Sequence, residues 1–581
     1  MSIATHERTP SLVVGSVKIQ IDAAPDDETA RAIATALATH LDRSVELVVD
    51  DEPVATAGQE GDWDDPVVTE REETLRTEIE EILTGGPERG HEKIAELGKI
   101  FVRDRLEMIF DEITYEDGTF ARHDADGELP ADGMITGVGK IRGRTVFFAA
   151  NDYTVKAGSL GMMGVEKEIR MAERAAEAGA PILRLIDSTG ARLDLDDREE
   201  GDTHMDRYRG GKMFYNQCIH SGQVPQIGVL YGPDIAGSAY TPVFCDFLIM
   251  VEEIAGMAIA SPRVVEAVTG EQTTMQELGG PDVHARHSGS ADLVVPDEQT
   301  AAESVRDLFS YLPQRHDAPL PTSEPALPSK NPRGIDAIIP DEPNAAYEVR
   351  DVIERIVDAD SWYELKPQFA PELVTGFGKI DGRPVGFVAN QPAVKSGAIF
   401  PDSAEKGAGF VWTCDAYGIP VIYLCDTPGF MVGSAVEKQG VLQKGRKFIY
   451  ATSNAQVPKI CVITRKAYGA GIYAMAGPSF DPDATLALPS AEISVMGPEA
   501  AVSALFGDQL KDMDDEQRES FIEGMRTEHD KMIDVRKQAA KMQFDELVPA
   551  GDLRDQLGAR LEALRHKRRT DRDRYHGTVL F

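Results

Sequence analysis

An internal repeat constrains the fold of this chain more than any other feature. The segment that begins at Ile135, ITGVGKIRGRTVFFAANDYTVKAGS, returns 239 residues later at Val374 as VTGFGKIDGRPVGFVANQPAVKSGA. At the same offset GAPILRLIDSTG matches GIPVIYLCDTPG, and after a shift of six positions Tyr240 corresponds to Tyr473. Several ordered blocks that keep one offset indicate a duplication. The chain therefore contains two copies of one fold.

Within each copy, short apolar strands alternate with helices. In the first copy we expect strands over GKIRGRTVFFAAND, ILRLID and QIGVLYG, and helices over VEKEIRMAERAAEA and GGKMFYNQCIHSGQ. Gly179 follows the first helix as its expected C-cap. Continuous apolar strands separated by helices are typical of an α/β domain whose sheet is covered. The sequence therefore predicts two α/β domains in tandem.

The domain boundaries follow from two stretches that lack the repeat. Residues 313–343 are rich in proline and have almost no apolar periodicity, which predicts an extended linker between the copies. The N-terminal segment has no counterpart in the repeat; there we expect a strand (SVKIQID), an Ala-rich helix (DDETARAIATALATHLD) and a strand (VELVV). We therefore expect a small appended α/β element at 1–60 and two domains at 61–330 and 331–581.

The charge of the chain excludes several partners. Lysine and arginine number 60 against 98 aspartate and glutamate residues, which gives a net charge of −38. Such a surface repels phosphate backbones and anionic lipid, so we expect neither nucleic-acid nor membrane binding. No apolar run approaches the ~20 residues of a membrane span, and the start MSIATHERTP lacks the apolar core of a signal peptide. We expect a soluble, cytoplasmic protein.

The acidity has two interpretations. It is either a solvated surface that keeps a large enzyme soluble or an adaptation to a salt-rich cytoplasm, where electrostatic screening lengths become short. Because the acidic residues are spread along the whole chain instead of forming one tail, we favour the halophilic interpretation.

Many familiar reactive-site patterns are missing. The five cysteines include no CxxC pair, and His284 and His287 lack an acidic third ligand at metal spacing. We therefore expect no metal site and treat both histidines as structural or surface residues. The motifs GxxxxGK[ST] and GxSxG do not occur, and GSLGMMG lacks the strand context of a dinucleotide fold.

The most informative segments follow the last apolar strand of each copy. In the first copy GPDIAGSAY runs from Gly232 to Tyr240, and in the second KAYGAGIY runs from Lys466 to Tyr473. Small residues let a ligand approach the backbone, and first-turn amides have no intrahelical acceptor, which is the geometry of an oxyanion hole. A tight turn that needs glycine only for packing is the alternative. The matched positions in a duplicated fold favour function.

Two aspartates end the preceding strands, Asp187 in LIDSTGAR and Asp426 in LCDTPGF. They could form a catalytic carboxylate pair, but we prefer the interpretation that each holds its own glycine turn by Asx-type hydrogen bonds. Paired oxyanion holes without a serine or cysteine nucleophile suit chemistry on a stabilised enolate and a second polarised carbonyl.

Together these blocks resemble the carboxyltransferase (β) subunits of biotin-dependent acyl-CoA carboxylases, which consist of two crotonase-type domains. The resemblance extends from about Leu97 to Leu557 and is carried by ADGMITGVG, ANDYTVKAGS, DSTGAR, FYNQ, SPRVVEAVTGEQTTMQELGG, DTPGFMVG, YGAGIYAM and AEISVMGPEAAV. It implies an α/β fold made of tandem ClpP/crotonase domains with the small N-terminal element appended.

The resemblance also implies the chemistry. One hole holds the thioester enolate of a short-chain acyl-CoA, and the other holds the ureido oxygen of carboxybiotin, which gives up CO₂. By position the first hole falls on Ala236 and Gly237, and the second on Ala470 and Gly471 with Tyr473 on the biotin side. The first loop reads IAGSA where the family usually has AGGA. With Ala236 in place of the usual glycine, the backbone amide is still present as a donor, whereas the acyl pocket need not keep its shape.

The family's partners follow from two further observations. The chain has no ATP-grasp loop and no Met-Lys-Met biotin site, since AAKM at Lys541 lies in a helical run. The resemblance therefore implies a separate biotin carboxylase/biotin carrier (α) subunit, which alone uses ATP. It also implies a hexamer with active sites across dimer interfaces. Residues 1–60 either dock the biotin-bearing partner or are a dispensable extension.

The substrate and the direction of the reaction stay open. YGAGIYAM resembles the 3-methylcrotonyl-CoA type more than the propionyl-CoA type, which usually has aspartate where Tyr473 stands. The carboxyltransferase subunit of a sodium-pumping acyl-CoA decarboxylase is the alternative enzyme. A scaffold or regulatory paralogue is the non-enzymatic alternative.

Overall fold

The computed structural model describes residues 68–122, 129–192, 210–342, 344–511 and 513–567, with shorter pieces at 16–20, 44–49 and 52–57 and at residues 30, 33, 34, 37 and 578. The chain divides into two compact units, Met1–Thr84 and Gly85–Phe581. Both copies of the repeat lie in the second unit. The expected boundary at residue 60 therefore differs from the end of the first unit, and the boundary near residue 330 stays a prediction.

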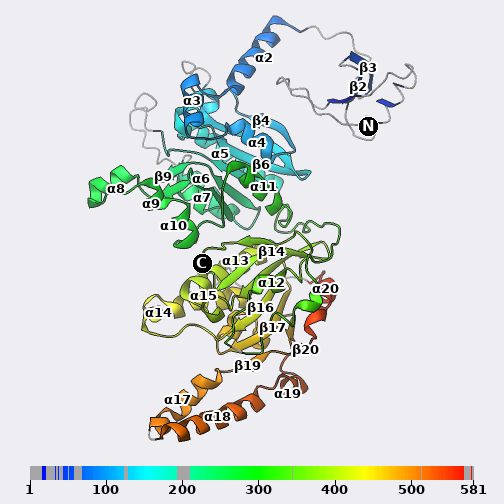
Figure 1. Ribbon diagram of the computed structural model, residues 1–581. Coiled ribbons are helices and arrows are strands. Elements are labelled where there is room, and N and C mark those ends of the chain that lie inside the picture. Colours follow the sequence, from blue (N-terminus) through cyan, green and yellow to red (C-terminus); the bar gives the residue numbers. More distant parts are fainter. Residues whose placement is uncertain are drawn as a thin grey trace. The chain divides into compact units, whose positions relative to one another are not determined.

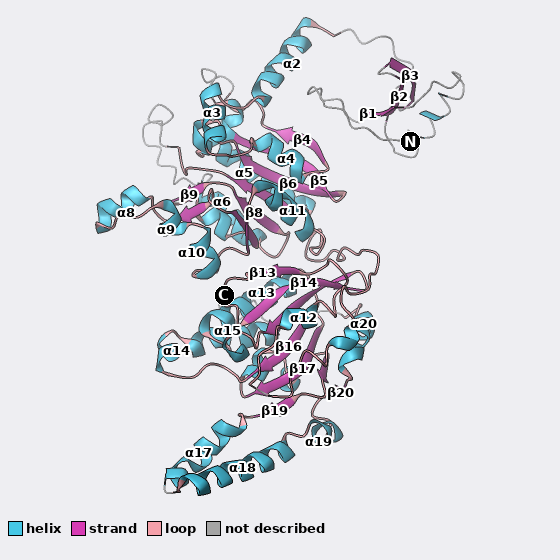
Figure 2. Ribbon diagram, viewed as in Figure 1, coloured by secondary structure: helices cyan, strands magenta, loops and turns pink. Residues whose placement is uncertain are grey.

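The described residues of the first unit include three strands, labelled in Figure 2: β1 (Ser16–Gln20), β2 (Ser44–Val49) and β3 (Glu52–Ala57). Strand β2 pairs parallel with β1 and antiparallel with β3. The sequence predicted the first two strands and missed β3, whose Glu and Pro are uncommon in strands. The four described residues of the expected helix are helical, and α2 (Glu70–Leu83) also belongs to this unit.

The first copy of the repeat forms a seven-stranded sheet in the order β12-β10-β8-β7-β6-β5-β4. The strands are β4 (Glu112–Asp117), β5 (Met134–Ile141), β6 (Arg144–Asn151), β7 (Ile182–Ile186), β8 (Gln226–Leu230), β10 (Phe247–Val251) and β12 (Leu293–Val295). Strands β4, β5 and β6 are antiparallel neighbours, and the pairings from β6 to β12 are parallel. The expected helices are α5 (Met162–Ala178), which ends at Gly179 in the left-handed conformation, and α6 (Gly210–His220).

The second copy repeats this topology strand for strand. It is the part of the chain coloured from green to red in Figure 1. Its sheet has the order β13-β14-β15-β16-β17-β18-β20. The strands are β13 (Tyr363–Leu365), β14 (Leu373–Ile380), β15 (Arg383–Asn390), β16 (Val421–Thr427), β17 (Lys459–Tyr468), β18 (Ala484–Ala487) and β20 (Glu546–Leu547). Gly137 faces Phe148 across the first hairpin, and Gly376 faces Phe387 across the second. The duplication inferred from the sequence is therefore confirmed.

Helices cover both faces of each sheet. In the first copy α5 packs on one face through Ala172 and Ala175, while α4 (Val102–Ile109) and α11 (Glu298–Leu308) pack on the other. In the second copy α13 (Pro401–Ala416) and α15 (Val441–Asn454) cover one face, and α12 (Val349–Ile353) and α20 (Leu553–Ala563) cover the other. This explains why the parallel strands are apolar at consecutive positions.

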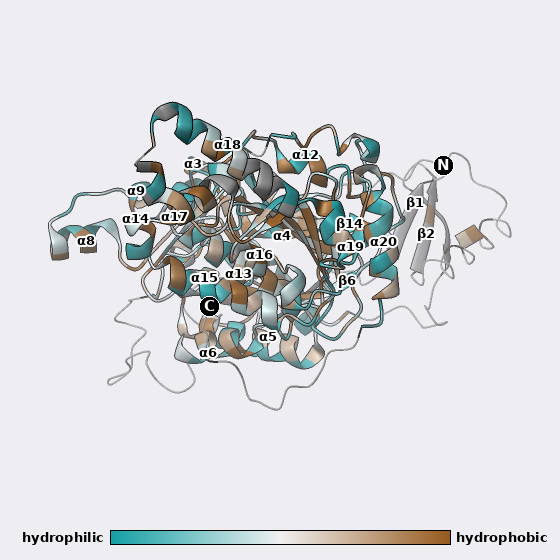
Figure 3. Cartoon of the chain, turned by 90° about the horizontal axis from the view of Figure 1, so that it is seen from below, coloured by the Kyte–Doolittle hydropathy of each residue, from teal (hydrophilic) through white to brown (hydrophobic). Residues whose placement is uncertain are grey.

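The two copies share one core. A single hydrophobic cluster contains residues of both, and Phe377 of the second copy lies against the rings of Phe247 and Tyr311. The hydroxyl of Tyr417 donates to the carbonyl of Val224, 3.0 Å away. In Figure 3 hydrophobic colouring follows the inner strands, and hydrophilic colouring is concentrated on outer helices.

The described residues form further α-helices outside these packed layers of helix and sheet. They are α3 (Glu88–Glu96), α7 (Tyr240–Val243), α8 (Pro262–Thr269), α9 (Met275–Gly279), α10 (Pro281–Arg286), α14 (Ser434–Lys438), α16 (Gly471–Ala474), α17 (Pro498–Lys511), α18 (Asp515–Met532) and α19 (Val535–Ala540). The sequence predicted AAKM within a helical run, whereas α19 ends at Ala540 and Lys541 is its C-cap. Within the described ranges, no helix is both long and apolar enough to span a bilayer.

Candidate functional site

Each copy carries one glycine-containing turn at equivalent places in the topology. In the first copy a short strand, β9 (Pro233–Ile235), pairs parallel with β11 (Gly256–Ala258) and leads through residues 236–239 into α7. In the second copy the end of β17 pairs parallel with β19 (Glu492–Ser494) and leads through residues 469–470 into α16. The first turn and the second turn below refer to residues 236–239 and 469–471.

Backbone geometry fixes which residues of the two turns correspond. Ala236 has φ 65° and Gly469 has φ 56°, so both begin their turns in the left-handed region. The Ala236 amide donates to the carbonyl of Ala258 (3.0 Å), and the Gly469 amide donates to the carbonyl of Ser494 (3.1 Å). Ala236 is therefore the counterpart of Gly469, not of Ala470.

This register corrects one sequence-based assignment. The expected donors of the first hole were Ala236 and Gly237, but the amide of Ala236 is used within the protein. The counterparts of Ala470 and Gly471 are Gly237 and Ser238. In the described part of the chain no acceptor meets the amides of these four residues. Each turn thus presents two adjacent unpaired N–H groups, which are the components of an oxyanion hole.

A second strained turn accompanies each of these, and sequence reasoning used it only as a marker of the repeat. Lys156 and Ala157 have φ 49° and 54°, and Lys395 and Ser396 have φ 48° and 55°. Left-handed conformations at non-glycine residues cost energy and concentrate at functional sites. The amides of Ala157 and Ser396 also have no acceptor among the described residues. The blocks KAGS and KSGA, matched at one offset, are the signal that could have indicated them.

Contacts bring the turns of each copy together. The Thr189 amide donates to the carbonyl of Ala157 (3.3 Å), and Leu160 forms a parallel bridge with Ala191. A Cβ on Gly190 would lie 3.0 Å from the carbonyl oxygen of Ile235, which places this segment against the first turn.

The second copy repeats these contacts. Ile399 bridges Phe430, and a Cβ on Gly471 would lie 2.8 Å from the Cα of Gly429. The unpaired amides of each copy therefore belong to one local site, and the molecule has two such sites of the same design.

Asp187 is a buried counter-ion. Its carboxylate accepts from the Nζ of Lys99 (2.6 Å) and from Arg105 (2.9 Å), and Arg105 also pairs with Glu298. Burial lowers the pKa of Lys99, and the carboxylate of Asp187 opposes that effect. The amide of Gly190 is held by the hydroxyl of Ser188 (3.1 Å), not by Asp187. We expected the Asp187 side chain to accept a hydrogen bond from its own glycine turn. That expectation is wrong, because the side chain that accepts from the Gly190 amide is Ser188.

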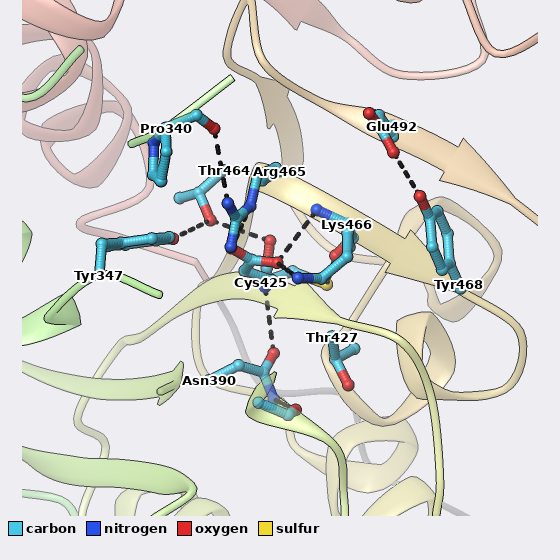
Figure 4. Close-up of polar contacts among 12 residues, drawn as sticks. Pro340, Tyr347, Asn390, Cys425, Thr427, Thr464, Arg465, Lys466, Tyr468 and Glu492 are labelled. Atoms are coloured by element: carbon cyan, nitrogen blue, oxygen red, sulfur yellow. Dashed lines mark hydrogen bonds and ion pairs between the residues drawn. The ribbon is translucent and has the colours of Figure 1, made fainter. Parts of the chain in front are cut away.

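Asp426 has the same role with different cations, Arg465 and Lys466, which are labelled in Figure 4. It accepts from Arg465 (2.9 Å) and lies 3.3 Å from the Nζ of Lys466. The hydroxyl of Thr427 accepts from the Gly429 amide at 3.1 Å, as Ser188 does in the first copy. Both aspartates are almost fully buried and charge-compensated, so they stabilise the strand ends and do not form an acid–base pair.

The structure also describes the histidine and cysteine candidates from the sequence analysis. His284 is structural, because Ser288 Oγ lies 2.8 Å from its Nδ1 and the Met257 carbonyl 2.9 Å from its Nε2. No described group of three His, Cys, Asp or Glu residues could hold a metal ion. The five cysteines are free, and three of them are buried: Cys414, Cys425 and Cys461.

An exposed tyrosine follows each turn. Tyr240 is 46% exposed and stacks on Phe244, with ring centroids 5.8 Å apart. Tyr473 is 40% exposed and stacks on Phe480, with ring centroids 4.9 Å apart. Both rings are therefore available to a ligand or to another subunit.

Comparisons with known proteins find relatives that match most of the chain. The carboxyl transferase domain family matches residues 94–579. An uncharacterized carboxylase of Bacillus subtilis is 46% identical over 87% of this chain and 98% of that protein. The propionyl-CoA carboxylase carboxyltransferase subunit of Haloferax mediterranei is 38% identical over 88% of this chain and 99% of that protein.

The solved structure of the transcarboxylase 12S subunit, a hexamer with methylmalonyl-CoA bound, has a TM-score of 0.81. It is 36% identical and covers 89% of this chain and 99% of its own. The expected fold, two crotonase-type α/β domains in tandem, is confirmed.

Proposed function

Because the chain belongs to the carboxyl transferase family, we propose that it is the carboxyltransferase subunit of a biotin-dependent acyl-CoA carboxylase and acts on a short-chain acyl-CoA. The observation that carries this proposal is the pair of matched turns, each with adjacent backbone amides that no described residue accepts from. Two carbonyl oxygens must be polarised in carboxyl transfer, one on each substrate. The duplicated fold supplies one hole for each.

In the first hole, the amides of Gly237 and Ser238 donate hydrogen bonds to the thioester oxygen of the acyl-CoA, assisted by the amide of Ala157. Negative charge gathers on this oxygen as the α-proton leaves, and fixed N–H donors stabilise the enolate more than the ground state. The new carbon–carbon bond would form between the α-carbon and the transferred carboxyl carbon as the bond from that carbon to the ureido nitrogen breaks, and the freed ureido nitrogen would take the α-proton. No side-chain nucleophile is required.

The second turn fits the carbonyl of a ureido ring. The unpaired amides of Ala470 and Gly471 would hold the ureido oxygen, and the amide of Ser396 lies in the same local site. Carboxybiotin, carried by the partner subunit, supplies the carboxyl group when bound. Gly471 lies against Gly429 and Thr427, so the position of its amide is fixed by packing.

The oligomer and the partner belong to this proposal. The 12S subunit is a hexamer, and we propose a hexamer here too, with the first turn of one subunit facing the second turn of another. Exposed apolar residues support a covered surface beside the second turn: Val432 is 79% exposed and Val495 is 80% exposed. We propose a separate biotin carboxylase/biotin carrier subunit that uses the ATP, and a cytoplasmic location.

The direction of the reaction has two candidates. The same holes stabilise the same enolate in either direction, and the 12S subunit binds methylmalonyl-CoA, an already carboxylated thioester. A subunit of a sodium-pumping decarboxylase therefore stays the second candidate. A scaffold paralogue would be indicated by an assembled complex without any transfer activity.

The test is to purify the complex, identify its biotinylated partner and assay acetyl-, propionyl- and 3-methylcrotonyl-CoA side by side at high KCl. A carboxylase forms the carboxylated product in the presence of ATP and bicarbonate. A decarboxylase instead co-purifies with a membrane subunit and consumes methylmalonyl-CoA without ATP.

A further inference from the structure

Each copy has a short strained turn that begins with a lysine and belongs to the same local site as one hole. The first lysine turn is residues 156–157, and the second lysine turn is residues 395–396. All four residues are left-handed, with φ between 48° and 55°, and none of them is glycine. Such conformations persist only where surrounding contacts enforce them. Each copy must therefore contain an anchor that holds its lysine turn.

Thr189 anchors the first lysine turn. Its amide donates to the carbonyl of Ala157 at 3.3 Å, and its hydroxyl donates to the same oxygen at 3.2 Å. Thr189 belongs to the segment that follows β7 and lies against the first turn. One residue thus fixes the carbonyl of Ala157, whose own amide is unpaired.

The second copy cannot use this anchor. At the offset of 239, the counterpart of Thr189 is Pro428, which has neither an N–H group nor a hydroxyl. Within the described ranges no donor meets the carbonyl of Ser396. The second lysine turn nevertheless has the same left-handed conformation as the first, so different contacts must hold it.

A buried glutamate supplies these contacts. Glu372 directly precedes β14, its side chain is only 1% exposed, and it accepts from the Nζ of Lys395 at 3.1 Å. The same Nζ lies 4.2 Å from the centre of the Phe400 ring, which is a cation–π contact. Phe400 is the N-cap of α13. The lysine side chain is therefore held between the start of β14 and the start of α13.

The first copy lacks both partners of this clamp. At the positions of Glu372 and Phe400 it has Gly133 and Gly161, although the lysine is kept as Lys156. Glycine supplies neither a carboxylate nor a ring. The first copy therefore anchors the carbonyl of its lysine turn, whereas the second copy anchors the lysine side chain.

We propose that Glu372 is a positioning residue for the second hole and acts through Lys395 on the amide of Ser396. The inference rests on the proposed function, because it assumes that the second hole holds the ureido oxygen. Ser396 directly follows Lys395, and its unpaired amide belongs to the same local site as those of Ala470 and Gly471. Because a buried carboxylate is costly without its cation, the ion pair holds Lys395 in one position.

The test uses the complete complex, with the acyl-CoA and the carboxylated carrier varied in turn. Glu372→Gln releases the lysine and should lower kcat by about tenfold, less than the loss of a whole oxyanion donor. It should raise the KM for the carrier by about fivefold, the effect of one ordinary hydrogen bond. The KM for the acyl-CoA should stay within about twofold of wild type, since the first copy is untouched.

A second variant separates the clamp from a general effect of removing a buried carboxylate. Lys395→Met removes only the charge of a side chain that is 49% exposed, and it should cause the same changes in kcat and carrier KM. The double variant should lose no more than either single one, because both remove one contact. If Glu372→Gln does not assemble, Lys395→Met decides.

Thr189→Val supplies the reciprocal measurement in the first copy. It removes the hydroxyl that donates to Ala157 and keeps the shape of the side chain. The KM for the acyl-CoA should rise by about threefold to fivefold, while the KM for the carrier stays unchanged. Opposite effects of the two variants on the two KM values are not expected if the residues only stabilise the fold.

Glu405→Gln is the matched control. Glu405 in α13 pairs with Lys444 and Lys447, at 2.9 Å each, so the variant breaks ion pairs of the same copy without touching the clamp. It should keep wild-type kinetics. A carrier KM within twofold of wild type in Lys395→Met, or an equal rise in the KM for the acyl-CoA, overturns the inference. A wild-type complex that transfers to no acyl-CoA overturns the proposed function itself.

Discussion

Replacing Gly471 by alanine tests the second hole directly. A Cβ at this position would lie 2.8 Å from the Cα of Gly429 and 2.9 Å from Cγ2 of Thr427. The nearest of these atoms is backbone, so it cannot turn away. To restore an ordinary contact of about 3.4 Å, the second turn must move roughly 0.6 Å away from the segment that contains Thr427 and Gly429. The unpaired amide of Gly471 moves with its turn.

The expected loss follows from the sensitivity of oxyanion donors to position. Removing one such donor costs about 10²–10³ in rate, and misplacing a catalytic group by ~1 Å costs about 10². Gly471→Ala should therefore reduce carboxyl transfer by about 10²-fold. Because Gly237 and Ser238 are untouched, the KM for the acyl-CoA should stay within about threefold of wild type.

The assay is steady-state transfer by the purified complex, with acyl-CoA and carboxylated carrier varied in turn. Gly409→Ala is the matched control, since a Cβ at Gly409 in α13 meets no atom within 4 Å. This control should show wild-type rates. A Gly471→Ala complex with transfer within threefold of wild type would refute the assignment of the second turn, and a raised KM for the acyl-CoA would show that the two turns are assigned to the wrong substrates.

Four further predictions concern stability, pH, specificity and salt. Asp426→Asn should lower the free energy of unfolding by about 3–5 kcal/mol, measured by denaturant titration, because it leaves Arg465 buried without its counter-ion; a change below 1 kcal/mol contradicts this. Asp234→Asn should raise the free energy of unfolding by roughly 4 kcal/mol at pH 7 and above, and by nothing below about pH 4. The sign follows because the wild-type carboxyl, with its pKa raised from 3.8 to about 7, loses stability as pH rises between those values; equal stabilities at pH 8 would refute it. Tyr473→Asp should shift kcat/KM toward propionyl-CoA over 3-methylcrotonyl-CoA by about tenfold, and an unchanged ratio removes Tyr473 from substrate selection. The unfolding temperature should rise with added KCl if the acidity is halophilic; a maximum without added salt contradicts that interpretation.

Much of the fold follows from local patterns in the sequence. The repeat gave the tandem architecture, and Gly179 ended α5 because a left-handed C-cap suits glycine. The apolar runs became strands covered on both faces, since buried parallel strands need apolar residues at every position. Strand β3 was missed because Glu and Pro are uncommon in strands, and pairing with β2 overrides that preference.

The donors of the two holes stay a prediction. The resemblance placed the first hole on Ala236 and Gly237, and the structure shows that the Ala236 amide donates to the carbonyl of Ala258 on another strand. The left-handed conformation of Ala236 (φ 65°) could not be predicted from the sequence, because that conformation is normally expected at glycine. The offset that pairs Tyr240 with Tyr473 also pairs Ala236 with Gly469, so the equivalence was present in the sequence. The use of the Ala236 amide within the protein needed three-dimensional information.

The electrostatics could not be predicted from the repeat. Asp187 pairs with Lys99 and Arg105, which precede it by more than 80 positions, whereas Asp426 pairs with Arg465 and Lys466 on the next strand. The two copies conserve the acid and the turn while taking their cations from different elements. The cations that pair with one aspartate therefore cannot be inferred from those that pair with the other. A periodic sequence pattern does not reveal such long-range contacts either.

The central claim is that the two turns serve two substrates of one carboxyl transfer. The most direct measurement is carboxyl transfer from the carboxylated carrier to acetyl-, propionyl- and 3-methylcrotonyl-CoA by the wild-type complex in high KCl, with products identified by mass spectrometry. The account predicts a carboxylated product from at least one of these thioesters and a loss of about 10²-fold in Gly471→Ala. An assembled, biotinylated complex that carboxylates none of them would contradict it.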